Sequence, residues 1–118
     1  MSLAADRLAF KQALDTVAWV TAFQYPPNGG YASGDAWPLV SRINYPDKFG
    51  GLVAWEIFIV LHADVATSEQ LLDAHMPALR AAVAPLMTVT SVEPRLLQFE
   101  SGSALAVVVI AGTREETA

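Results

Sequence analysis

The chain has 118 residues, enough for one domain of ordinary size and too few for two. Hydrophobic residues make up 53% of it and charged residues 16%, a composition that excludes a disordered chain. The absence of cysteine excludes disulfides, thiolate metal sites and cysteine nucleophiles. The formal net charge is −5 with seven scattered basic residues, which disfavours tight binding of nucleic acid.

The N-terminal part predicts a helix followed by a strand. Apolar residues recur at helical spacing over Leu3 to about Thr16, with Ser2 as a candidate N-cap and Asp6 in the first turn, where the helix dipole favours an anion. Aromatic and β-branched residues then alternate from Trp19 to Tyr25, which is typical of a strand. Two prolines and two glycines over residues 26–30 end it.

Two strands are predicted in the middle of the chain. The first runs from about Trp37 to Asn44, and a turn rich in Pro and Gly separates it from the second. The second, Leu52 to His62, is dense in Val, Ile, Phe and Trp on both of its faces. It is therefore expected to be a central strand covered on both sides, with a neighbouring subunit as one candidate cover.

A second helix and two strands are predicted in the C-terminal half. Thr67-Ser-Glu-Gln70 reads as a capping box that opens a helix to about Ala84. Pro77 lies inside it, which predicts one kinked helix or, as the alternative, two short helices. An extended segment follows from Thr88 to Phe99, in which Pro94 marks a break, a bulge or an edge position.

The last strand is predicted over Ala104 to Thr113, after a turn at residues 100–103, and the polar tail from Arg114 to Ala118 is expected to fray. The element order is then α-β-β-β-α-β-β in a single domain over residues 1–118. Helices and strands do not alternate, so the predicted fold class is α+β: a mostly antiparallel five-stranded sheet with two helices packed on one face.

No motif in the chain points to catalysis or to a cofactor. The glycine pairs 29–30 and 50–51 have turn chemistry, and neither a P-loop nor a nucleophile elbow is present. His62 with Asp64 and His75 with Asp73 are candidate metal ligands, although they are far apart in sequence. The favoured interpretation is a strand-end and a helix-surface histidine. We therefore expect no enzyme activity, no metal and no cofactor.

Aromatic residues gather in or beside the loops rich in Pro and Gly. Loop aromatics are enriched at protein–protein contacts, so these residues are candidate interface residues. The alternative for Trp37 is that it fills the core of the domain itself. The candidates are Tyr25, Tyr31, Trp37, Tyr45 and Phe49.

Several segments, in order, resemble a known family. They are Trp19-Val-Thr-Ala-Phe-Gln-Tyr-Pro-Pro, Gly34-Asp-Ala-Trp-Pro38, an apolar strand, Asp73-Ala-His-Met-Pro-Ala-Leu79 and Val92-Glu-Pro94. Together they resemble the tail terminator proteins of long-tailed bacteriophages, particularly phages of actinobacteria. The similarity extends over nearly the whole chain.

The resemblance implies a structural virion protein with no catalytic residue. Tail terminators form hexameric rings that cap the tail tube, stop its polymerisation and join the tail to the head connector, while double-stranded DNA passes through the ring without specific binding. The location implied is the virion tail after assembly in the host cytoplasm. No signal peptide and no membrane helix is visible in the sequence, in keeping with a protein that needs no membrane.

A ring through which DNA slides is expected to have an acidic inner wall, because basic residues would hold the phosphates. Candidates for this wall are Asp35, Asp47 and Glu56. Two alternatives stay open: another neck or tail-completion protein of the same virion, and a small ferredoxin-like enzyme or ligand-binding domain. For the latter, His62, Glu56 and Asp64 are the first residues to inspect.

Overall fold

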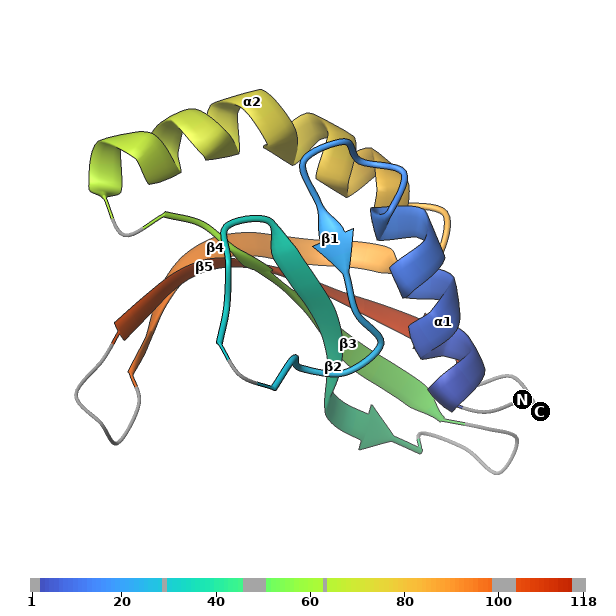
Figure 1. Cartoon of the computed structure of the whole chain (residues 1–118). Coiled ribbons are helices and arrows are strands. Elements are labelled where there is room, and N and C mark those ends of the chain that lie inside the picture. The colour runs from blue at the N-terminus through green and yellow to red at the C-terminus, as the bar shows by residue number, and fades with distance from the viewer. Residues whose placement is uncertain (1–2, 29, 46–50, 63, 99–103, 116–118) are drawn as a thin grey trace.

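Figure 1 shows the computed structural model of the chain, which describes residues 3–28, 30–45, 51–62, 64–98 and 104–115. The predicted element order and the α+β class are confirmed. The five strands form one sheet in the order β1-β2-β3-β5-β4. The elements are α1 (Leu3–Leu14), β1 (Thr21–Ala22), β2 (Asp35–Asn44), β3 (Leu52–Val60), α2 (Val65–Val83), β4 (Thr88–Gln98) and β5 (Ala104–Glu115).

The sheet is mixed, because β1 runs parallel to β2 while the other neighbours are antiparallel. The predicted strand over Trp19 to Tyr25 is also shorter than expected: only Thr21 and Ala22 pair with β2. The alternating side chains have separate partners instead of one shared face. Trp19 stacks on His75 of α2, with ring centroids 4.7 Å apart. Asp15, just after α1, accepts the N–H of Ala22 and so fixes β1 to the end of the helix.

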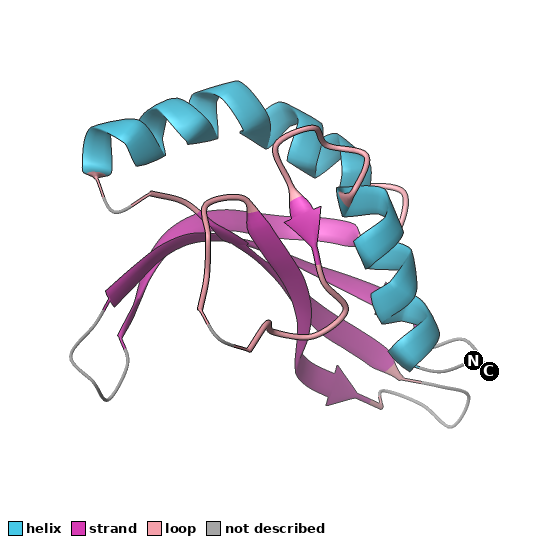
Figure 2. Cartoon of the chain, in the orientation of Figure 1, coloured by secondary structure: helices cyan, strands magenta, loops and turns pink. Residues whose placement is uncertain are grey.

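Both helices lie over one face of the sheet, as predicted (Figure 2). Phe10 and Leu14 of α1 and Leu79 and Val83 of α2 are almost completely buried there. They belong to one cluster with every second residue of β3, from Val53 to Ile59, and with Leu61 just after the strand. The ring of Phe10 packs at 5.2 Å from the ring of Trp55, which has no exposed surface. Each such side chain contributes about 1.5–3 kcal/mol through its burial.

β3 is the central strand that its composition predicts, between β2 and β5. Its alternate residues Phe58 and Val60 are also buried, on the face opposite the helices. Side chains of the same chain provide this second cover, so the apolar character of both faces needs no neighbouring subunit at these two positions.

Helix α2 begins earlier than predicted. Its N-cap is Asp64, whose carboxylate accepts hydrogen bonds from the Thr67 backbone N–H at 3.0 Å and from the Thr67 hydroxyl at 2.8 Å. The predicted capping box at residues 67–70 is therefore wrong. Thr67 lies three residues inside the helix and donates to the cap. Asp64 and Thr67 are both residue types that cap helix N-termini, and Asp is the stronger N-cap of the two.

Removing this cap is expected to destabilise the protein modestly and in a pH-dependent way. Asp64→Ala is expected to lower the melting temperature by a few degrees at neutral pH, because it leaves first-turn N–H groups without an acceptor. The hydrogen bonds from Thr67 lower the pKa of Asp64 below 3.8. A lowered folded-state pKa stabilises the fold above the ordinary value, and this contribution disappears as the pH falls through the folded value.

Asp64→Asn is the matched control, since Asn also caps helices but does not titrate. Thermal unfolding followed by circular dichroism between pH 7 and pH 2.5 measures both effects. The wild type is expected to approach Asp64→Ala in stability at the acid end, while Asp64→Asn keeps its difference from Asp64→Ala. A constant difference between wild type and Asp64→Ala over this range would contradict the role of the carboxylate.

Pro77 lies inside one continuous helix, which confirms a single α2 over the alternative of two short helices. Proline removes one backbone hydrogen bond and crowds the preceding turn, so a bend is expected. Figure 1 shows α2 bent over the sheet in this way. Pro77 itself is exposed, on the side of the helix away from the core.

The C-terminal hairpin confirms one predicted position for Pro94 and departs from the prediction at its end. Pro94 occupies an edge strand, one of the three positions considered, whereas the bulge in β4 falls between Val89 and Ser91. β5 continues to Glu115, so the expected fraying from Arg114 is wrong for residues 114 and 115. Arg114 is fixed by Asp6 of α1, at 3.3 Å between Nε and Oδ1, and donates from Nη1 to the Leu86 carbonyl at 2.7 Å.

Candidate functional site

The sheet face opposite the helices has an apolar centre of its own. Trp37, Phe58, Val60, Val107 and Val109 form this second cluster, and each is at most 6% exposed. The rings of Trp37 and Phe58 lie parallel, 5.9 Å between centroids, and Tyr31 packs on Trp37 at 5.1 Å. The loop after β1 thus contributes to the cover that no helix provides on this face.

A charged bridge crosses the same face. Arg95 of β4 contacts Glu56 of β3 at 3.1 Å, and its Nε donates to Glu93 at 2.6 Å. β5 lies between β3 and β4, so the Arg95 side chain reaches across it. The hydrogen bond with Glu93, aided by the charge of Glu56, raises the pKa of Arg95. One positive and two negative side chains leave this bridge with a single net negative charge.

β4 forms one edge of the sheet, and nearly all of its 11 residues are exposed. The backbone N–H and C=O groups on the outer side of an edge strand are unpaired and can bind a strand of another chain. Here the proline and the bulge interrupt the edge, as they do in proteins that avoid unlimited strand addition. Side chains rather than a continuous backbone ladder are therefore the expected means of contact at β4.

The other edge of the sheet carries the exposed aromatic residues. Tyr25 is 55% exposed, Tyr45 65% and Tyr31 36%, and all three lie after β1 or at the end of β2. Trp37 is only 3% exposed and packs within the chain's own core, in keeping with the alternative interpretation of that residue. Phe49 lies outside the described residues.

Tyr25 is held in place although its ring is largely exposed. The guanidinium of Arg7 lies 4.9 Å from the Tyr25 ring centroid and 5.4 Å from that of Trp55. Arg7 also donates to the Pro38 carbonyl at 3.0 Å. A core tryptophan, an arginine and a surface tyrosine thus form a stack. A ring ordered in this way loses little conformational entropy when a partner covers it.

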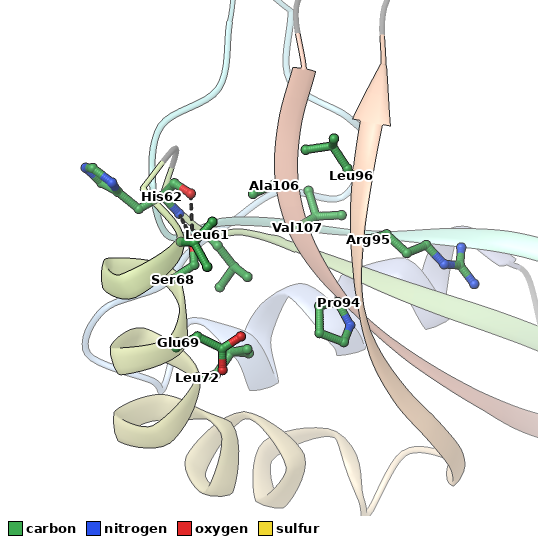
Figure 3. Close-up of a pocket in the computed structure, with 11 residues that line it drawn as sticks. Leu61, His62, Ser68, Glu69, Leu72, Pro94, Arg95, Leu96, Ala106 and Val107 are labelled. Carbon is green, nitrogen blue, oxygen red and sulfur yellow. Dashed lines mark hydrogen bonds between the residues drawn. The ribbon is translucent and has the colours of Figure 1, made fainter.

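An apolar groove of about 260 Å³ lies near the β4 edge, between the first turns of α2 and the β4–β5 hairpin (Figure 3). Its apolar wall includes two strongly exposed side chains, Val65 at 75% and Leu96 at 62%. The Glu69 side chain lies beside Leu72 on the α2 wall, while the His62 and Arg95 side chains point away from the groove. We call this feature the groove; its apolar wall is Leu61, Val65, Leu72, Pro94, Leu96 and Ala106.

The sequence did not predict the groove. Its two walls come from segments about 30 residues apart, and neither Val65 nor Leu96 stands out by motif. The available signal was the strong apolar character of Val65, which precedes the predicted helix, and of Leu96 in the predicted strand. A single exposed apolar residue is ordinary, so that signal becomes informative only when the fold brings two of them together.

The three candidate residues for an acidic inner wall have different environments. Asp35 accepts the backbone N–H of Ala32 at 2.8 Å and so stabilises the turn before β2. Glu56 is paired with Arg95 on the face opposite the helices. Asp47 lies outside the described residues. The structure does not gather Asp35 and Glu56 into one acidic cluster.

The residues of the enzyme and metal interpretations have separate local roles. His62 accepts the Asp64 backbone N–H on Nδ1, Asp64 caps α2, and His75 stacks on Trp19. Within the described ranges no three His, Asp or Glu side chains come together as metal ligands. None of the described helices is long and apolar enough to cross a membrane.

Comparisons with known proteins assign no family. The chain matches no protein-family model, and a search among curated proteins finds no significant match.

Proposed function

We propose that this chain is a ring-forming tail terminator of a long-tailed bacteriophage. In this role, copies of the chain form a closed ring, a hexamer in the family it resembles, on the end of the finished tail tube. The ring covers the surface to which the next tube subunit would add and offers its other face to the head connector. DNA passes through its centre, and no catalytic step or cofactor is involved.

One observation carries the proposal: among the described residues, the large exposed apolar side chains form two groups, one on the β1–β2 side of the molecule and one on the β4 side. The first group is Leu8 of α1, Tyr25 and Tyr31 of the loop after β1, and Tyr45 just after β2; the second is Val65 of α2 with Val92 and Leu96 of β4. A closed ring requires two different patches on each subunit, because each copy contacts one neighbour through each patch. The α+β fold and the order of the resembling segments support the same assignment.

The charge of the chain is compatible with DNA sliding through the ring. The net charge is −5, and Arg95, a basic residue on the sheet face opposite the helices, is paired with Glu56 and Glu93. Phosphates that meet no unpaired cluster of basic residues are held weakly. The inner wall of the ring is proposed to be acidic, with Glu56 and Asp35 as candidates among the described residues.

Deletion of the gene from the phage that carries it tests the function. Electron microscopy is expected to show tails of uncontrolled length without heads, and expression of the chain in the host is expected to restore tails of uniform length. Tails of normal length that fail to join heads would instead indicate a connector protein of the neck. Normal, infectious virions would exclude a role in the virion.

A further inference from the structure

We infer that the groove receives Tyr25 of a second copy of this chain, so that the copies join head to tail. The inference rests on the proposed function only in its expectation that the contact closes into a ring. The contact itself is derived from the shape, polarity and placement of the two surfaces, and these are independent of the phage context.

The first argument is size. Pockets that bind small molecules commonly measure about 300–1,000 Å³ and enclose most of the ligand. The groove measures about 260 Å³ and is open at its mouth, where Val65 and Leu96 are exposed. Such a shape accommodates one large side chain better than a metabolite. Among the described aromatic side chains, Tyr25 is both more than half exposed and fixed by a stacked cation.

The second argument is charge and polarity. The groove contains the Glu69 carboxylate, which forms no ion pair within the described part of the chain. Tyr25 brings a hydroxyl that donates hydrogen bonds and, directly behind its ring, the positive charge of Arg7. The two surfaces are therefore complementary. The apolar wall of the groove can pack against the Tyr25 ring, and the Glu69 carboxylate can accept a hydrogen bond from the Tyr25 hydroxyl and attract the positive charge of Arg7.

The third argument is placement. Tyr25 follows β1 at one edge of the sheet, and the groove lies near β4 at the other. A contact between them uses two different surfaces, so each joined pair retains one free Tyr25 and one free groove. This is the heterologous arrangement that generates rings or open chains rather than twofold dimers. The interrupted β4 edge leaves side-chain insertion as the means of contact.

Complementary variants test the pairing. Tyr25→Glu removes the ring and places a carboxylate against Glu69, and Leu96→Glu places a charge in the apolar wall. Light scattering coupled to size-exclusion chromatography is expected to show oligomers of the wild type at high concentration and monomers of each variant. An equimolar mixture of the two variants is expected to give dimers and nothing larger, because only one intact Tyr25 and one intact groove remain per pair.

Gln70→Glu is the matched control, because Gln70 is exposed on α2, does not line the groove and gains the same charge. It is expected to assemble as the wild type does. Assembly of Tyr25→Glu or Leu96→Glu alone to the wild-type extent would overturn the inference. A mixture that stays monomeric while the wild type assembles would overturn it as well, and is the result expected of a twofold-symmetric contact.

Disulfide trapping tests the contact between Tyr25 and the groove even where the isolated chain associates weakly. The chain has no cysteine, so every disulfide formed in an equimolar mixture of Tyr25→Cys and Leu96→Cys joins two introduced cysteines. At least a fivefold higher yield of this mixed dimer is expected than with Tyr25→Cys and Gln70→Cys. Equal yields would overturn the inference. Trapping without control of tail length would contradict the proposed function, and tail-length control without trapping would contradict this contact alone.

Discussion

Asp6→Ala is expected to lower the free energy of unfolding by about 2–4 kcal/mol, because Asp6 is the one buried charged residue in the described part of the chain. The Asp6 side chain is 5% exposed and lies 3.3 Å from Arg114, which is itself only 25% exposed. Without Asp6, a mostly buried guanidinium keeps its desolvation penalty and loses its counter-ion. The partial exposure of Arg114 places the expected effect toward the lower part of the range for fully buried pairs.

Urea denaturation at pH 7 measures this effect, and a double-mutant cycle isolates the pair. Asp6→Leu with Arg114→Met is expected to be more stable than the sum of the two single changes predicts, because it removes both charges together. Lys11→Ala is the control: it breaks the exposed Lys11–Asp15 pair and is expected to change stability by about 0.5 kcal/mol or less. A loss below 1 kcal/mol for Asp6→Ala would contradict the buried role.

The same ion pair illustrates what the sequence can and cannot predict. Asp6 lies in the first turn of α1, which explains it locally as an anion near a helix N-terminus. Its partner is more than 100 residues away, and no local pattern connects the two. The predicted fraying from Arg114 was wrong for that reason: the residue looks like part of a polar tail until the sheet brings β5 beside α1.

The elements with strong local signals were predicted well. α1, β3 and β5 follow from apolar periodicity or density, and the five-stranded α+β architecture follows from their order. The strand predicted over Trp19 to Tyr25 was too long, because the aromatic residues at its two ends pack on different partners: Trp19 on His75 and Tyr25 on Arg7. Periodicity indicates a strand only where alternate side chains share one environment, and the sequence alone does not distinguish these cases.

Of the two surfaces that form the proposed contact, the sequence predicted the aromatic one and not the groove. Loop aromatics indicated the surface that includes Tyr25 and Tyr45, which are indeed exposed. The groove that complements it depends on how far the bent α2 lies from the β4–β5 hairpin. That distance is a property of tertiary packing, so no spacing within one segment reports it.

Gly34→Ala is expected to lower the free energy of unfolding by about 3 kcal/mol or more, for two reasons that act together. Gly34 has a φ of +93°, a conformation in which a side chain is strained. An added Cβ would also lie 2.5 Å from the backbone oxygen of Trp19, which is too close for any real contact. Relief requires movement of the backbone, because the nearest atom does not belong to a flexible side chain.

Movement at Gly34 affects the pairing of three segments. Its carbonyl accepts the Thr21 N–H at 3.0 Å, and its own N–H donates to the Val60 carbonyl at 2.9 Å. Both bonds must lengthen if the chain shifts away from Trp19, and β1 then loses its position beside β2. Because Tyr25 follows β1 by three residues, trapping of Tyr25→Cys with Leu96→Cys is expected to fall in a Gly34→Ala background, at temperatures where the protein is still folded.

Gly30→Ala is the matched control, because it separates backbone strain from steric contact. Gly30 also has a positive φ, +114°, but an added Cβ would meet nothing within 4 Å. It is expected to cost about 1–2 kcal/mol, the strain alone. Urea denaturation of both variants measures the difference. Equal destabilisation would show that the close approach of Trp19 to Gly34 contributes nothing, and that the backbone at Gly34 relaxes without disturbing β1.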